Sequence, residues 1–148
     1  MTRPTPDTRE AYPHHLPIQT RWADADRYGH INNSVYYFYF DTVVNTWLVE
    51  RGVLSLEGDA RIGLVVDTGC AFFAPADFPA TLTAGLRVAH VGRSSVRYEI
   101  GIFADGDSVE QDGTVAQGHF VHVYVDAETR RPVMLDDAVR DILAELIT

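Results

Sequence analysis

One segment of the chain has the hydrophobic period of a buried helix. From residue 33 to about residue 50, apolar side chains recur every three or four positions, and aromatic residues fill the other faces. A helix that is apolar most of the way round is buried rather than lying on a surface. Asn32 or Asn33 is a suitable N-cap and Gly52 a natural stop, so we expect the helix between them.

Strand-like alternation of apolar and polar residues lies on both sides of this helix. A short strand is expected over residues 18–23, and four longer strands are expected over residues 62–74, 81–91, 94–103 and 114–125. Residues 104–107 carry a hairpin turn signal, and residues 136–146 are expected to form a closing helix. This order is typical of an α+β domain with an antiparallel sheet.

The length of 148 residues fits one domain with a sizeable core. Residues 1–16 are polar and proline-rich, so we expect a flexible lead-in without a secretory signal, followed by a single domain over residues 17–148. No apolar run approaches the roughly 18 residues that a membrane span needs. The single cysteine, Cys70, fits a reducing cytoplasm and is expected to be a small buried strand residue.

The net charge of −9 argues against general nucleic-acid binding. All twelve basic residues are arginines, and three of them, Arg87, Arg93 and Arg97, lie in a stretch without a carboxylate. Such a local patch could bind a phosphorylated ligand through forked hydrogen bonds. Solvated arginines on strands are the equally good alternative.

The densest group of polar side chains stands at the entrance of the expected helix. Two aspartates, a glycine, a histidine and two asparagines fall within residues 24–33. A helix N-terminus offers unsatisfied N–H groups and a partial positive charge, which stabilise an oxyanion. Asp26 could act there as a base or nucleophile, or it could only form a turn, whereas Asp24 is expected to bond to nearby backbone or Arg21.

A metal site is not expected. His119 and His122 are three positions apart on an expected strand, so their side chains point to opposite faces. Asp24, Asp26 and His30 lack a pattern of further ligands.

The block Asp-x-Asp-x-x-Gly-His-x-Asn-Asn at residues 24–33 resembles the hotdog-fold acyl-CoA thioesterases of the 4-hydroxybenzoyl-CoA thioesterase-like family. Weaker fragments follow in the family's order at residues 75–76, 92–95, 125–126 and 131–133. The resemblance covers residues 17–147 and implies an antiparallel sheet wrapped around one long buried central helix. The run from His30 to Asn33 is similar to a branch that acts on long-chain acyl groups, which disfavours an aromatic acyl group.

The resemblance also implies the chemistry. Asp26 would be the catalytic carboxylate, and a backbone N–H near Asn33 would polarise the thioester carbonyl. From the residues themselves, His30 could contact the thioester, position Asp26 or only form hydrogen bonds within the loop. Tyr36 could pack in the core or line the substrate pocket, and Gly29 is expected to lie against the substrate. Family members work as homodimers or homotetramers with active sites between subunits.

The expected substrate is an acyl-CoA, so CoA belongs to the substrate and no separate cofactor is expected. Arg93, Ser94 and Ser95 could bind its phosphates or its pantetheine arm, or they could form an ordinary turn between strands. A cytoplasmic location is expected. Two alternatives stay open: a hydratase or dehydratase on an acyl thioester, which would need His30 beside Asp26, and a non-catalytic acyl-CoA binding protein.

Overall fold

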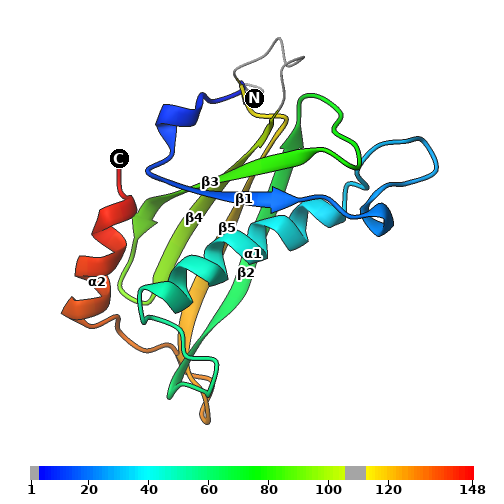
Figure 1. Ribbon diagram of the computed structural model, residues 1–148. Coiled ribbons are helices and arrows are strands. Elements are labelled where there is room, and N and C mark those ends of the chain that lie inside the picture. The colour runs from blue at the N-terminus through cyan, green and yellow to red at the C-terminus, as the bar shows by residue number, and fades with distance from the viewer. Residues whose placement is uncertain (1–3, 106–112) are drawn as a thin grey trace.

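The computed structural model describes residues 4–105 and 113–148, which form a five-stranded sheet with a long helix on one face (Figure 1). The strands are β1 (His14–Gln19), β2 (Arg61–Phe72), β3 (Thr81–Val91), β4 (Ser95–Ala104) and β5 (Ala116–Asp126). Their order in the sheet is β1-β3-β4-β5-β2, and every neighbouring pair is antiparallel. The helices are α1 (Val35–Glu50) and α2 (Asp137–Leu143), and the short 3-10 turns are η1 (Arg9–Ala11), η2 (Trp22–Asp24) and η3 (Ala144–Leu146). The α+β architecture expected from the sequence is confirmed.

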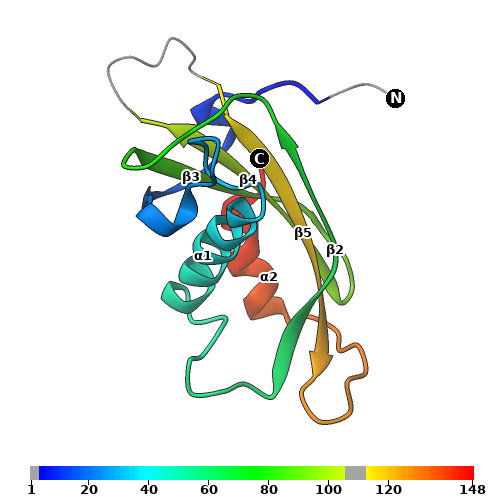
Figure 2. The ribbon, with the colours of Figure 1, turned by 90° about the vertical axis from the view of Figure 1, so that its right-hand side faces the viewer.

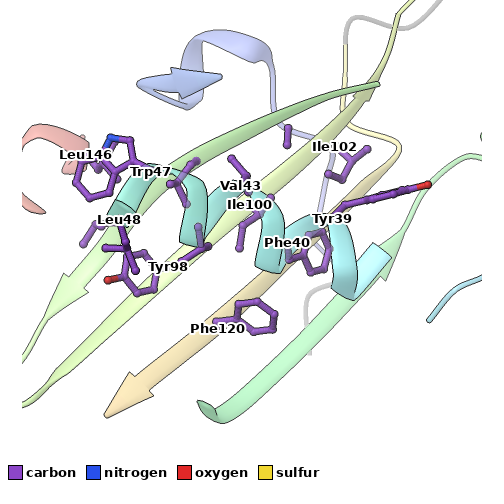
Figure 3. Packing of buried hydrophobic residues seen from close by; sticks show 14 of the residues in the cluster. Tyr39, Phe40, Val43, Trp47, Leu48, Tyr98, Ile100, Ile102, Phe120 and Leu146 are labelled. Atoms are coloured by element: carbon purple, nitrogen blue, oxygen red, sulfur yellow. The ribbon is translucent and has the colours of Figure 1, made fainter. Parts of the chain in front are cut away.

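Helix α1 packs along the inner, concave face of the sheet, and α2 lies beside it (Figure 2). The buried side chains of α1 are Tyr36, Tyr39, Phe40, Val43, Val44, Trp47 and Leu48. They meet inward-facing residues of the sheet such as Tyr98, Ile100 and Phe120 (Figure 3). The Phe40 ring lies directly on Gly118, where a Cβ would overlap it, so this glycine lets the helix approach β5.

The first turn of α1 differs from expectation. The helix begins at Val35 with Ser34 as its N-cap, while Asn32 caps the preceding turn: its Oδ1 accepts from Ser34 N at 3.0 Å and from Ser34 Oγ at 2.8 Å. One face of the helix is also open, since the Phe38 side chain is 64% exposed. The sheet therefore covers one side of α1 only.

The expectation of a flexible lead-in over residues 1–16 is wrong for its second half. Strand β1 begins at His14, and Tyr12 is buried on the outer face of the sheet against Gly85 and Gly101. These glycines are direct partners on β3 and β4, so together they leave room for an aromatic ring. The guanidinium of Arg87 covers that ring, with its carbon 4.6 Å from the ring centroid.

The expected strand over residues 18–23 ends at Gln19, and Trp22–Asp24 forms a 3-10 turn because the Asp24 side chain bonds back to the N–H of Arg21. Cys70 lies half-buried in β2, where burial raises the pKa of its thiol to about 12. The turn signal at residues 104–107 lies partly outside the described residues. Among the described helices, none is long and apolar enough to cross a membrane.

Candidate functional site

Residues 25–31, here called the aspartate loop, form a closed turn between η2 and α1. Ala25 and Ile31 pair as an isolated bridge at its base. Inside it, Asp26 N donates to the carbonyl of His30 at 2.7 Å, and Gly29 N donates to the carbonyl of Asp26 at 3.2 Å. Gly29 has a φ of 76°, a left-handed conformation that favours glycine. The loop is therefore held in one shape by its own backbone.

The Asp26 carboxylate is divided between a structural oxygen and a free one. Its Oδ1 accepts hydrogen bonds from the backbone N–H of Tyr28 at 2.8 Å and of His30 at 3.2 Å. Its Oδ2 accepts none from residues 4–105 or 113–148. The turn-forming role is thus real, and it leaves one oxygen of a fixed carboxylate available for chemistry.

The entrance of α1 offers a free donor. Val35 N donates to the carbonyl of Asn32 at 2.9 Å, and Ser34 N is capped by the Asn32 side chain. The N–H of Asn33 between them has no acceptor in the described part of the chain. This N–H group lies where the helix dipole favours negative charge.

The predicted site residues line two hollows on either side of the aspartate loop. The helix-side hollow has a volume of about 310 Å³ and includes His30, Asn33 and Tyr36. The aspartate-side hollow has a volume of about 480 Å³ and includes Asp26 and Gly29. The structure brings His30, Asn33 and Tyr36 together and places Asp26 and Gly29 on the other side of the loop. The two groups meet where His30 N donates to Asp26 Oδ1.

The wall of each hollow contains a pair of packed aromatic rings. Tyr36 packs edge-on against Phe72, with ring centroids 5.4 Å apart, in the helix-side hollow. Trp22 packs edge-on against Phe78 at 6.0 Å in the aspartate-side hollow. The sequence analysis did not single out Phe72, Phe78 or Trp22 as wall residues, because they come from segments whose approach only the fold defines.

Asp24 is fully buried beneath the aspartate loop. Its Oδ1 accepts from Arg21 Nε at 3.0 Å and Nη2 at 2.8 Å, and its Oδ2 accepts from Arg21 N at 2.9 Å and Tyr39 Oη at 2.7 Å. Burial raises the pKa of this carboxyl, but the hydrogen bonds from Tyr39 and Arg21 outweigh it and lower the pKa below its usual value. The expected structural role of Asp24 is confirmed. Tyr39 was missed, because it lies 15 positions further along and carries no local signal.

Neither alternative for the arginines, a phosphate-binding patch or solvated side chains, describes Arg87 and Arg97, which are paired with carboxylates. Arg87 Nε and Arg97 Nε both donate to the carboxylate of Glu99, at 2.9 and 3.0 Å, and Arg87 also pairs with Asp7 at 3.1 Å. The reason is strand geometry: Glu99 stands directly opposite Arg87 in the sheet and two residues after Arg97 on the same face. Arg87 and Arg97 therefore already have carboxylate partners.

The turn with Arg93, Ser94 and Ser95 lies between β3 and β4. Arg93 is exposed, and its carbonyl accepts from Leu135 N at 2.9 Å, beside the approach to α2. Within one protomer this turn is at the end of the molecule opposite the start of α1 (Figure 1). Its contact with substrate stays a prediction.

The described residues contain no group of three His, Cys, Asp or Glu side chains arranged to bind a metal ion. His119 lies on the outer face of β5 and pairs with Asp67 at 2.9 Å, whereas His122 is buried on the inner face. The prediction that these two histidines face opposite ways is confirmed.

The chain belongs to the thioesterase-like superfamily, whose family model matches residues 20–143. Among solved structures, the PA5185 protein from Pseudomonas aeruginosa strain PAO1 is 49% identical with a TM-score of 0.90, covering 97% of this chain and 98% of that one. The PA2801 protein from Pseudomonas aeruginosa is 30% identical with a TM-score of 0.78, covering 88% and 97%.

A thioesterase from Thermus thermophilus, complexed with coenzyme A and Zn, is 27% identical with a TM-score of 0.74, covering 93% and 96%. No curated protein matches the chain. The resemblance to hotdog-fold thioesterases is confirmed. Membership of the 4-hydroxybenzoyl-CoA branch stays a prediction.

Proposed function

We propose that the protein hydrolyses an acyl-CoA thioester to a carboxylic acid and free CoA. The observation that carries this proposal is a fixed carboxylate and a free helix N-terminus on the two sides of one short loop: Asp26 has one unbonded oxygen, and Asn33 one unbonded N–H, within the described residues. The superfamily supports thioester hydrolysis in general. The coenzyme A bound to the Thermus thermophilus thioesterase supports CoA as the carrier.

The helix-side hollow is suited to the thioester carbonyl. A carbonyl oxygen that accepts from the N–H of Asn33 would lie at the positive end of α1, so negative charge that develops on it is stabilised. One such donor contributes about 3–4 kcal/mol in the transition state. With an acyl group in the hollow, the rings of Tyr36 and Phe72 would shield this interaction from water and so strengthen it.

Asp26 would supply the other half of the reaction through its free Oδ2. This oxygen either bonds to the carbonyl carbon as the C–S bond breaks, giving a mixed anhydride that water then hydrolyses, or takes a proton from an attacking water. In both routes the CoA thiolate leaves and gains a proton. The hydrogen bonds to Oδ1 fix the carboxylate in orientation.

A second copy of the chain would complete the site. Strand β2 is at the edge of the sheet, and Leu64, Val65 and Val66 expose apolar surface there. Antiparallel pairing of two β2 strands would continue the sheet and cover this surface. The start of one β2 would then lie beside the end of the other, where Phe72 lines the helix-side hollow.

This pairing would also give the turn at residues 93–95 a role. Arg61, at the start of β2, pairs with Asp126, and Ser95 pairs with Val123 on the same strand β5. The turn therefore lies at the end of the molecule where β2 begins. In a homodimer, the partner subunit's Arg93 would approach this subunit's hollow, where it could contact CoA. We therefore propose active sites between subunits.

Release of free thiol from short, medium, long and aromatic acyl-CoAs tests the proposal. Turnover is expected for the wild type, and a fall in kcat of about 100- to 10,000-fold for Asp26→Asn. Asp77→Asn is the matched control, because Asp77 lines the same hollow. Among the described residues only Phe78 N donates to its carboxylate, and asparagine can accept the same bond. Full turnover by Asp26→Asn would contradict the mechanism. No turnover on any acyl-CoA would contradict the function.

A further inference from the structure

We propose that Asp24 and Tyr39 are positioning residues, whose hydrogen bond ties the aspartate loop to helix α1 and so holds Asp26 in place relative to the N–H of Asn33. This inference rests on the proposed function, in which that carboxylate and that N–H act on one carbonyl. Neither Asp24 nor Tyr39 is assigned any contact with the substrate.

Asp24 bonds to each of the segments that bound the loop. Its backbone carbonyl accepts from Asn32 N at 2.9 Å, at the point where the chain leaves the loop for the helix. Its side chain accepts three hydrogen bonds from Arg21, at the start of η2, and one from Tyr39 on α1. One residue therefore links the entrance of the loop, its exit and the helix.

The contact between Asp24 and Tyr39 is suited to fixing the orientation of the two segments, and not only to filling space. The Asp24 side chain has no solvent exposure, whereas the Arg21 side chain is 70% exposed. A buried carboxylate is costly unless each oxygen is bonded, and the bonds it needs are directional. An apolar side chain could fill this space, but it would not fix the angle between η2 and α1. Tyr39 supplies the contact from the helix.

A small shift of Asp24 would move Asp26 with it. Only Ala25 separates the two aspartates, and the bridge of Ala25 with Ile31 makes the loop move as one piece. Misplacing a reacting group by about 1 Å costs on the order of 100-fold in rate. Loss of the Tyr39 hydroxyl should therefore act on kcat, although this hydroxyl contacts no substrate.

Tyr39→Phe, compared with Tyr98→Phe, tests this inference. Tyr98 also buries a hydroxyl, which bonds to the hydroxyl of Tyr124 at 2.8 Å, but it lies near the opposite end of α1 (Figure 3). Both variants lose one buried hydrogen bond and keep the ring. Tyr39→Phe is expected to lower kcat by about 10- to 100-fold with KM and both limbs of the pH profile unchanged. Tyr98→Phe is expected to keep the wild-type kcat.

A second measurement does not depend on activity. The amide of Asn32 donates to the carbonyl of Asp24, and the amide of Ile31 donates to the carbonyl of Ala76, so these two bonds tie the loop to its surroundings. The hydrogen exchange of these two amides, followed by NMR, therefore reports whether the loop is held in place. Exchange at both amides should be faster in Tyr39→Phe than in the wild type, and unchanged in Tyr98→Phe. Equal kcat and equal exchange in the two variants would overturn the inference. If the wild type showed no turnover, the proposed function would be wrong, but the hydrogen-exchange comparison would still test whether Asp24 and Tyr39 hold the loop.

Discussion

At the scale of single residues, His122 is the buried side chain whose burial most clearly costs folding free energy. It is 5% exposed, its ring lies between Tyr98 and Phe120, and neither ring nitrogen has a partner in the described structure. Burial lowers the pKa of His122 to about 4. The unfolded chain would bind the proton near pH 6.5, so protonation favours unfolding. The stability that the neutral His122 ring contributes is therefore fully present above about pH 6.5, and it is lost as the pH falls toward about 4.

The variant His122→Phe tests this pH dependence, because phenylalanine keeps the ring without titrating. Between about pH 7.5 and about pH 5, the wild type should lose about 2 kcal/mol more free energy of unfolding than the variant does. Urea unfolding at the two pH values measures the difference. Parallel losses in both proteins would show that His122 does not govern acid sensitivity.

Asn33 contributes a backbone group rather than a side chain to the proposed reaction. Asn33→Ala keeps the N–H, so kcat is expected to stay within about threefold of wild type. Thiol release under saturating substrate measures this. A loss as large as that of Asp26→Asn would instead assign the amide side chain to catalysis.

His30 distinguishes hydrolysis from the hydratase alternative. In the proposed hydrolysis its backbone N–H holds Asp26, so His30→Ala should lower kcat by less than Asp26→Asn does. A hydratase with an acid and a base would lose activity equally in both variants. Thiol release and hydration of an enoyl-CoA, measured side by side, separate the two reactions.

At the scale of elements, hydrophobic period predicted the sheet and the long helix well. Strands β2 to β5 begin and end within about two residues of expectation. In β3, β4 and β5 the reason is that alternate side chains are buried against one core, whereas no residue of β2 is buried in the single chain. The predicted start of β1 lies too far along the chain, because Pro17 and two histidines obscure the alternation of apolar and polar residues. Pro17 fits there because β1 is an edge strand, where a missing N–H costs little.

The candidate site was predictable only where its residues are neighbours in sequence. The residues from Asp24 to Asn33 are close together in sequence and in the fold, so a site there could be proposed from the sequence alone. The bond of Asp24 with Tyr39 depends on tertiary contact, and the pairing of Arg87 with Glu99 depends on strand register. Spacing along the chain does not encode these contacts.

The approach of α1 to the sheet depends on Gly118. Gly118→Ala would push a methyl group into the Phe40 ring, which is buried and has no room to move. We expect a loss of about 1–3 kcal/mol in the free energy of unfolding. Denaturant unfolding measures it. Adding Phe40→Leu to that variant should recover part of the loss, and no recovery would place the strain elsewhere.

At the scale of the whole molecule, the edge position of β2 predicts that two copies of the chain associate as a homodimer. Val65→Lys would place a charge in the proposed strand pair, so a homodimer should dissociate and lose turnover together. Sedimentation velocity and thiol release measure the two effects. Val121→Lys, on the neighbouring strand β5 but away from the edge, is the control and should change neither. An active monomer would contradict a site shared between subunits.

The position of Tyr12 also bears on the order in which the chain can fold during synthesis. Its two glycine neighbours, Gly85 and Gly101, come far later in the chain, on β3 and β4. A nascent chain that leaves the ribosome N-terminus first has no surface for Tyr12, or a strand partner for β1, until β3 and β4 have emerged. Tyr12 and β1 are therefore synthesised before the strands that they pack against, and they reach their final positions only after those strands have emerged.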